Sequence, residues 1–186
     1  VSNRLPVRIE KEGKTYSYKP SEGGLATGLG SIYKQGNNLW IGWPGASFKD
    51  RAVKKEISAG LRQESMKPVF LTEQDVEDYY LGFSNQTLWP AFHYFIHYIQ
   101  FDANHWRAYK KANKKFTEAI VEELEPTDIV WLHDYQLLLV AHYLREQFPD
   151  LTIGFFQHIP FPSYEVFRMI PWRRELLNGM LGADYI

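Results

Sequence analysis

A chain of 186 residues, 45% of them hydrophobic and 23% charged, can build one well-buried domain and has no compositional signature of disorder. Its formal net charge of −1 excludes a strong basic field, so we expect neither nucleic-acid nor membrane partners. It contains no cysteine, which excludes disulfides and thiol nucleophiles and is compatible with the cytoplasmic location that we expect.

The first part of the chain predicts strands joined by turns. Residues 7–19 alternate polar and apolar side chains around Gly13, which is typical of a β-hairpin. Three further elements are expected here: a glycine-rich turn leading into a helix over 21–34, a buried strand over 38–45 and a second strand over 67–72.

The rest of the chain predicts helices and strands in alternation. Trp106, Tyr109 and Phe116 belong to an apolar series with spacings of three and four, which predicts an amphipathic helix over 105–124. The alternation favours a parallel sheet, so we predict an α/β, Rossmann-like domain with helices on both faces of the sheet. The other predicted elements are helices over 72–80, 135–148 and 173–182, strands over 128–134 and 151–158, and a short last strand.

The stretch GFFQHIPFP, residues 154–162, places a titratable ring at the end of an apolar strand. His158 in this position fits a core histidine. It also fits a site residue, because ligands bind beyond the carboxyl ends of parallel strands. The chain begins in what looks like the end of a strand, which Arg4 follows, and Asp134 stands at the end of the strand over 128–134. A parallel sheet would bring these groups to one edge. This convergence favours a site residue for His158.

Gly23 and Gly24 stand just before a predicted helix. Glycines let backbone amides approach a phosphate or a sugar closely, although a plain tight turn would use them equally well. The stretch lacks the GxGxxG fingerprint and therefore gives little support to a nicotinamide cofactor.

Two charged residues at strand ends have chemistry that suits a phosphorylated sugar. Asp134 precedes a predicted helix and fits a plain helix cap, but a cap uses one oxygen and leaves the second for sugar hydroxyls. The guanidinium of Arg4 offers a bidentate fork for a phosphate.

The stretch YYLGFSNQTLWPAFHY, residues 79–94, is rich in aromatic side chains. It could pack beneath a long loop, or Tyr80 and Trp89 could present polar tips and flat faces to a sugar phosphate. His93 and His97 have the spacing of metal ligands on a helix, but no third ligand is evident. We therefore interpret both as packing or loop histidines, and expect no metal and no cofactor.

Six stretches together resemble the trehalose-6-phosphate synthase family: VSNRLPV, EGGLATGL, LWIGWPG, YYLGFSNQTLWPAFHY, WLHDYQLLL and GFFQHIPFPSYEVFR. The resemblance covers essentially the whole chain in the family's order. It implies the N-terminal, acceptor-binding domain of a two-domain GT-B glycosyltransferase over residues 1–186, with the donor-binding domain outside the chain. It also implies a retaining enzyme of trehalose biosynthesis that transfers glucose from UDP-glucose to glucose-6-phosphate without a metal.

The same resemblance implies roles for single residues. The family's acceptor positions fall on Arg4, Tyr80, Trp89 and Asp134, with the first two at the phosphate. Its donor positions fall on Gly23 and Gly24, at the diphosphate, and on His158, at the transferred glucose. Asp134 and His158 are the expected catalytic residues, with no covalent nucleophile beside them.

Two alternatives remain. The family's basic residues for the UDP pyrophosphate lie outside this chain, so a non-catalytic, regulatory sugar-phosphate-binding module also fits. A transferase with another phosphorylated acceptor fits too, because small pocket changes govern that choice. Both ends of the sequence look like interrupted strands, so we expect a fragment of a longer protein. A homo-oligomer and a fused phosphatase domain are compatible with the family.

Overall fold

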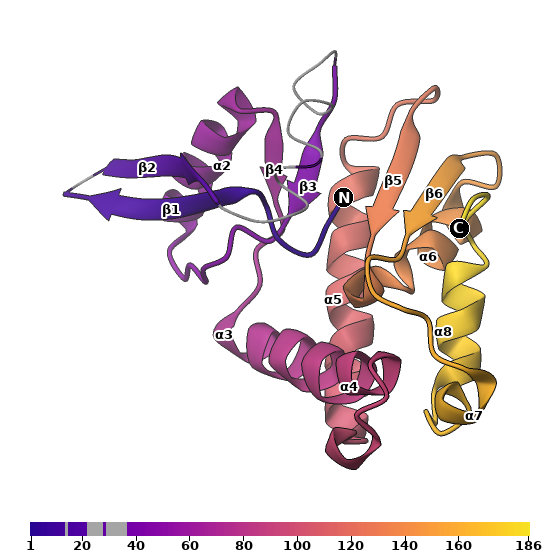
Figure 1. Ribbon diagram of the computed structural model, residues 1–186. Coiled ribbons are helices and arrows are strands. Elements are labelled where there is room, and N and C mark those ends of the chain that lie inside the picture. Colours follow the sequence, from indigo (N-terminus) through magenta and orange to yellow (C-terminus); the bar gives the residue numbers. More distant parts are fainter. Residues whose placement is uncertain (14, 22–27, 29–36) are drawn as a thin grey trace. The chain divides into compact units, whose positions relative to one another are not determined.

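The computed structural model describes residues 1–13, 15–21, 28 and 37–186, so most of the predicted helix over 21–34 lies outside the described residues. The described chain divides into two compact units. We call Ser2–Thr72 the N-terminal unit, and Val1 together with Glu73–Ile186 the C-terminal unit. Figure 1 labels their helices and strands.

In the N-terminal unit, β1 (Val7–Glu12) and β2 (Thr15–Pro20) form the antiparallel hairpin that the alternating pattern predicts. Gly13 lies in the turn between them with a φ of +65°. This left-handed backbone conformation is one that glycine adopts without steric cost. The predicted hairpin is therefore confirmed.

The predicted strand over 38–45 appears as β3 (Trp40–Gly42), which pairs in parallel with β4 (Met66–Pro68). The second prediction, over 67–72, overlaps β4 only at residues 67 and 68. Between β3 and β4 runs α2 (Arg51–Gln63), which was not among the predicted elements. Its fully buried Ile57 and Leu61 are four residues apart, as on one face of a helix. This short apolar stripe was the signal that the prediction missed.

Asp50 begins α2 as a helix cap. Its Oδ1 accepts hydrogen bonds from the backbone N–H groups of Ala52 and Val53, at 2.6 and 3.2 Å. The helix then packs its apolar stripe into the core of the unit, which includes Leu5 and Trp40.

The C-terminal unit opens with one long helical run. It consists of α3 (Glu73–Asp75), the π-helix η1 (Val76–Leu88) and α4 (Trp89–Phe92). The predicted helix over 72–80 is therefore too short, because the helical run continues through most of the aromatic stretch as far as Phe92. Tyr79 and Phe83 are fully buried, and they hold the run in place by packing against Tyr109 of α5 (Ala103–Val121).

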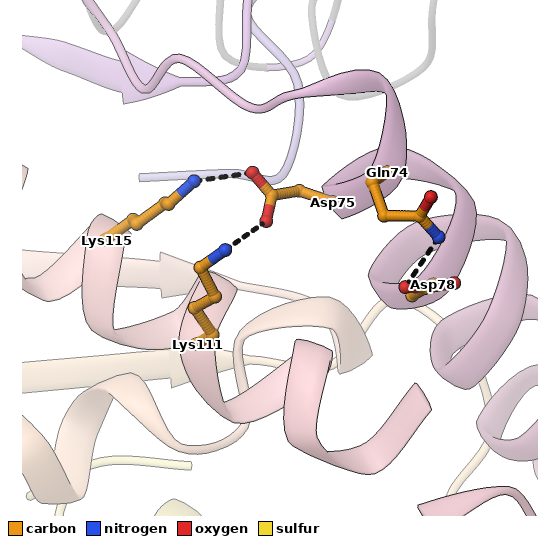
Figure 2. A network of polar contacts seen from close by, with 5 residues as sticks. All are labelled: Gln74, Asp75, Asp78, Lys111 and Lys115. Carbon is orange, nitrogen blue, oxygen red and sulfur yellow. Dashed lines mark hydrogen bonds and ion pairs between the residues drawn. The ribbon is translucent and has the colours of Figure 1, made fainter. Parts of the chain in front are cut away.

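An ion-pair network also joins this run to α5 (Figure 2). Lys115 and Lys111 of α5 contact the two carboxylate oxygens of Asp75, at 2.5 and 3.1 Å. Gln74 donates to Asp78 at 2.8 Å, one helical turn further along the chain. The start of the run that carries Tyr80 is thus fixed by charge as well as by packing.

The predicted parallel strands of the C-terminal unit are confirmed as β5 (Ile129–His133) and β6 (Thr152–Phe156), with Ile129 opposite Thr152 and His133 opposite Phe156. Near the end of the chain, Tyr185 forms a further parallel bridge to Gly154. The helical elements between and after these strands are η3 (Tyr135–Leu137), α6 (Val140–Gln147), α7 (Tyr164–Phe167) and α8 (Arg173–Met180).

Burial alternates along β5 although its sequence is an apolar run. Val130 and Leu132 are buried, whereas Ile129 and Trp131 are 73% and 42% exposed. The two buried side chains point to the same face because side chains alternate along a strand. In the part of the chain that the structure describes, no helix combines the length and the hydrophobicity needed to span a bilayer.

Candidate functional site

The carboxyl ends of β5 and β6 bring Asp134 and His158 together. The backbone N–H of Asp134 donates to Phe156 O at 2.8 Å, and the backbone N–H of His158 donates to Asp134 Oδ1 at 3.3 Å. The same Oδ1 accepts from the N–H of Tyr135 at 3.0 Å, where Asp134 caps η3. Among the described residues nothing donates to Asp134 Oδ2. The carboxylate thus caps a helix through one oxygen, as the sequence predicts, and leaves its second oxygen without a donor among the described residues.

Asp134 has a strained backbone. Its φ of +76° and ψ of 167° lie in a region that is essentially restricted to glycine. For any other residue this conformation costs about 1–3 kcal/mol and persists only where the surroundings impose it. Such strain concentrates at ligand-binding and catalytic positions, which favours a functional role for this residue.

The surroundings of Asp134 also change its acidity. Burial raises the pKa of the carboxyl group, against the opposing effects of the Tyr135 and His158 N–H groups and of the charges of His158 and His93. The electrostatic effect of His93 means that this ring lies near the carboxylate. The sequence predicts a packing or loop histidine at this position and contains no signal of this electrostatic effect.

His158 is also held by His133, the last residue of β5. His133 Nδ1 and His158 Nε2 share a hydrogen bond at 3.0 Å, and the two rings stack with centroids 5.2 Å apart. His133 is buried, and burial lowers its pKa to about 3, with further lowering by the charge of His158. A neutral His133 therefore binds one ring nitrogen of His158 and restrains the ring.

Aromatic side chains from the helical run lie near the same residues. Trp89 stacks on His93, with ring centroids 4.2 Å apart, and its carbonyl oxygen is 2.8 Å from His93 Nδ1. The indole of Trp89 is 39% exposed and so remains accessible. Burial raises the pKa of Tyr135, and Asp134 and Tyr80 add smaller electrostatic contributions in the same direction. Tyr80 therefore lies near Tyr135, the residue that follows Asp134.

Two polar residues of this region were missed by the sequence analysis. The hydroxyl of Tyr135 donates to Asn85 Oδ1 at 3.1 Å, and this bond connects η1 to the cap at Asp134. Both residues stand inside the stretches that the sequence analysis singled out, so their proximity to the predicted site residues was the available signal. Their pairing depends on a contact between residues 50 positions apart.

Arg4 belongs to the N-terminal unit. It forms a parallel bridge to Trp43, just after β3, and its guanidinium carbon lies 5.8 Å from the centre of the Trp43 ring. The Arg4 side chain is exposed, and no described carboxylate pairs with it. Gly42 allows this arrangement, because a Cβ at that position would lie 2.9 Å from Ser2 O.

The remaining predicted site residues, Gly23 and Gly24, lie outside the described residues. The roles assigned to Arg4, Tyr80, Trp89, Asp134 and His158 stay predictions. What the structure adds is geometry: the two strand ends of the C-terminal unit do meet at Asp134 and His158. Within the described ranges, no group of three or more His, Cys, Asp and Glu side chains could hold a metal ion.

Comparison with known proteins gives a consistent result. The chain is 45% identical over 188 residues to an α,α-trehalose-phosphate synthase (UDP-forming) of Dictyostelium discoideum, covering 100% of the chain and 25% of that relative. A crystal structure of a UDP-forming trehalose-phosphate synthase from Burkholderia xenovorans, in complex with glucose-6-phosphate, matches with a TM-score of 0.77 and 31% identity. It covers 98% of this chain and 38% of its own.

A third match is the N-terminal domain of a trehalose-6-phosphate phosphatase from Candida albicans, with a TM-score of 0.76 and 32% identity, covering 98% of this chain and 39% of that one. The chain spans between 25% and 40% of the length of the curated relatives that it matches. Its architecture is that of the N-terminal Rossmann-like domain of a GT-B glycosyltransferase, as predicted. The sequence pattern of glycosyltransferase family 20 matches residues 1–186, and the chain belongs to that family.

Proposed function

We propose that the protein to which this chain belongs transfers glucose from UDP-glucose to glucose-6-phosphate, giving trehalose-6-phosphate and UDP. The observation that carries this proposal is the arrangement around Asp134. A strained, half-buried carboxylate accepts hydrogen bonds at one oxygen from the backbone N–H groups of Tyr135 and His158, and its other oxygen is unpaired among the described residues. The relative solved with glucose-6-phosphate supports the acceptor.

In this reaction the anomeric hydroxyl oxygen of glucose-6-phosphate forms a bond to C1 of the donor glucose. The bond between C1 and the UDP oxygen breaks, and the hydroxyl proton leaves on the side of the departing diphosphate. Such a transfer depends on positioning and on stabilisation of developing charge more than on a strong base. A partly buried carboxylate and a restrained histidine meet that requirement, and neither has to become a covalent nucleophile.

We assign the individual roles as follows. Asp134 Oδ2 accepts hydrogen bonds from hydroxyls of the acceptor sugar, while Trp89 offers its exposed ring to the sugar and Tyr80 its hydroxyl to the phosphate. Arg4 binds the same phosphate through its planar fork. On the donor side, His158 faces the transferred glucose, and Gly23 and Gly24 contact the diphosphate.

In the same proposal, residues 1–186 supply the acceptor-binding half, and a second domain outside the chain binds uridine and most of the diphosphate. The test uses the full-length protein with UDP-glucose and glucose-6-phosphate and measures the release of UDP. Asp134→Asn keeps a residue that caps helices well and removes the charge, so it is expected to lose turnover without losing the fold. The proposal fails if the unmodified protein releases no UDP with these substrates.

The match to the N-terminal domain of a phosphatase favours one alternative. In that case the chain is a synthase-like module that binds a sugar phosphate, fused to a phosphatase domain, and does not transfer glucose. Calorimetry distinguishes the two functions. Binding of glucose-6-phosphate without release of UDP would indicate the module, whereas binding together with turnover indicates the transferase.

A further inference from the structure

Gly45, in the loop after β3, lies against the side chain of Arg4. A Cβ built on Gly45 would lie 2.7 Å from both Nε and Nη2 of Arg4 and 3.0 Å from Cζ. Real side chains do not approach each other this closely. Any residue other than glycine at this position would therefore displace the guanidinium of Arg4.

The Arg4 guanidinium also lies over the indole ring of Trp43, 5.8 Å from its centre. The indole is fixed in turn. Its Nε1 donates to Ala46 O at 3.2 Å, and the backbone N–H of Trp43 donates to Asn3 O at 2.9 Å. Arginine stacks on aromatic faces and keeps its planar fork oriented when it does so. In the stretch Trp43-Pro44-Gly45, the indole of Trp43 thus provides a flat surface for the guanidinium of Arg4. Gly45, which has no side chain, leaves room for the same group.

We propose that Gly45 is a positioning residue for Arg4: its missing side chain leaves the space in which the guanidinium lies against Trp43 with its fork oriented toward the phosphate of the acceptor. The inference rests on the proposed function, in which Arg4 binds that phosphate. A bidentate contact depends on orientation, so displacing the guanidinium weakens it even though the charge is unchanged.

Backbone conformation is a second reason for a glycine at this position, and the experiment has to separate the two. Gly45 has a φ of +83°, so a substitution is strained whatever the surrounding space. Gly13 is a suitable control, because it has a φ of +65° in the turn between β1 and β2 and a Cβ there would meet nothing within 4 Å. Gly13→Ala therefore carries the backbone cost without any contact to Arg4.

The clash at Gly45 involves the far end of a flexible side chain, so the fold can relieve it by moving Arg4. In the full-length protein, Gly45→Ala and Gly13→Ala are thus expected to lower Tm by similar amounts, within about 2 °C of each other. Their kinetics should differ. Gly45→Ala should raise the KM for glucose-6-phosphate about tenfold, while Gly13→Ala leaves it unchanged, since losing one good charged hydrogen bond has an effect of this size. The KM for UDP-glucose should stay the same in both variants.

A double-mutant cycle with Arg4→Lys links the effect to Arg4. If Gly45 acts through the guanidinium, Gly45→Ala should change the acceptor KM less than about twofold in the Arg4→Lys background, because interacting positions are not additive. Should Gly45→Ala prevent folding, Gly45→Asn replaces it, with Gly13→Asn as its control. Asparagine tolerates positive φ better than alanine and still carries a Cβ.

The outcomes separate this inference from the proposed function. If Arg4→Lys raises the KM for glucose-6-phosphate while Gly45→Ala and Gly13→Ala have equal KM values, the role of Gly45 is overturned and the proposed function is not. If none of the three substitutions changes the KM for glucose-6-phosphate, Arg4 does not bind the phosphate. The proposed role of Gly45 then fails as well. Full additivity in the double mutant also overturns the inference, since it would mean that Gly45 acts without Arg4.

Discussion

Asp75 is the residue whose removal should loosen the helical run that carries Tyr80 and Trp89. Its side chain is 5% exposed, and the two lysines that pair with it differ, because Lys115 is 27% exposed whereas Lys111 is 65% exposed (Figure 2). Asp75→Ala leaves Lys115 partly buried without its counter-ion. Breaking a buried ion pair in this way costs about 3–5 kcal/mol, and we expect the lower end because Lys115 can reach solvent.

The two lysines should contribute unequally. Lys111→Met removes an exposed partner, which is worth about 0–1 kcal/mol, whereas Lys115→Met removes the shorter and more buried contact and should cost more. Urea unfolding of the three variants measures these free energies directly, and the slope m checks that the unfolding mechanism is unchanged. The reasoning is refuted if Lys111→Met is as costly as Lys115→Met, or if Asp75→Ala costs less than about 1 kcal/mol.

Two further predictions concern the C-terminal unit. Since burial lowers the pKa of His133 from 6.5 to about 3, the unfolded chain binds more protons than the folded one between these values, and stability should fall as the pH is lowered from about 6.5 toward 3. Urea titrations at several pH values should show a flatter dependence for His133→Gln, and an equal slope in both proteins would contradict the prediction. Gly179→Ala in α8 would put a Cβ 2.3 Å from Leu138 O, so it should destabilise the protein by about 1–3 kcal/mol, because backbone cannot move aside as a side chain can. A Tm within about 1 °C of the parent would argue against this close contact.

The parts of the fold that the sequence predicted correctly are those in which local pattern and tertiary packing agree. In α5 the apolar spacing alone places Trp106, Tyr109 and Phe116 in the core, and all three are buried. The hairpin at Gly13 follows in the same way from alternation and a turn residue. The predicted helix over 72–80 covers only the start of the run from Val76 to Leu88. Its continuation was not predictable on that basis, since the wide π-helical turns pack against α5 and have no pattern of their own in the sequence.

The candidate site, like the fold, was predictable only in part, where strand order determines it. Parallel strands bring their carboxyl ends together, so the meeting of Asp134 and His158 follows from strand order alone. The hydrogen bond between His133 and His158, and the one between Tyr135 and Asn85, required the three-dimensional structure. His93 stacks on Trp89, as a packing histidine would. Its electrostatic effect on Asp134 depends on how the helical run is oriented, and no spacing in the sequence reports that orientation.

Asp134 also allows a decisive comparison between folding and function. If the fold alone determined the residue, glycine would serve better, since it caps a helix only a few tenths of a kcal/mol less well than aspartate and would relieve about 1–3 kcal/mol of backbone strain. We therefore expect Asp134→Gly to be at least as stable as the parent and to lose glucosyl transfer. Asp134→Ala loses the same carboxylate but keeps the strain, so it should be less stable than Asp134→Gly by about 1–3 kcal/mol. Urea unfolding and UDP release, measured on both variants, provide the comparison. Equal stability of the two variants would show that the strain is absent, and retained transfer in Asp134→Gly would leave the carboxylate without a role in the reaction.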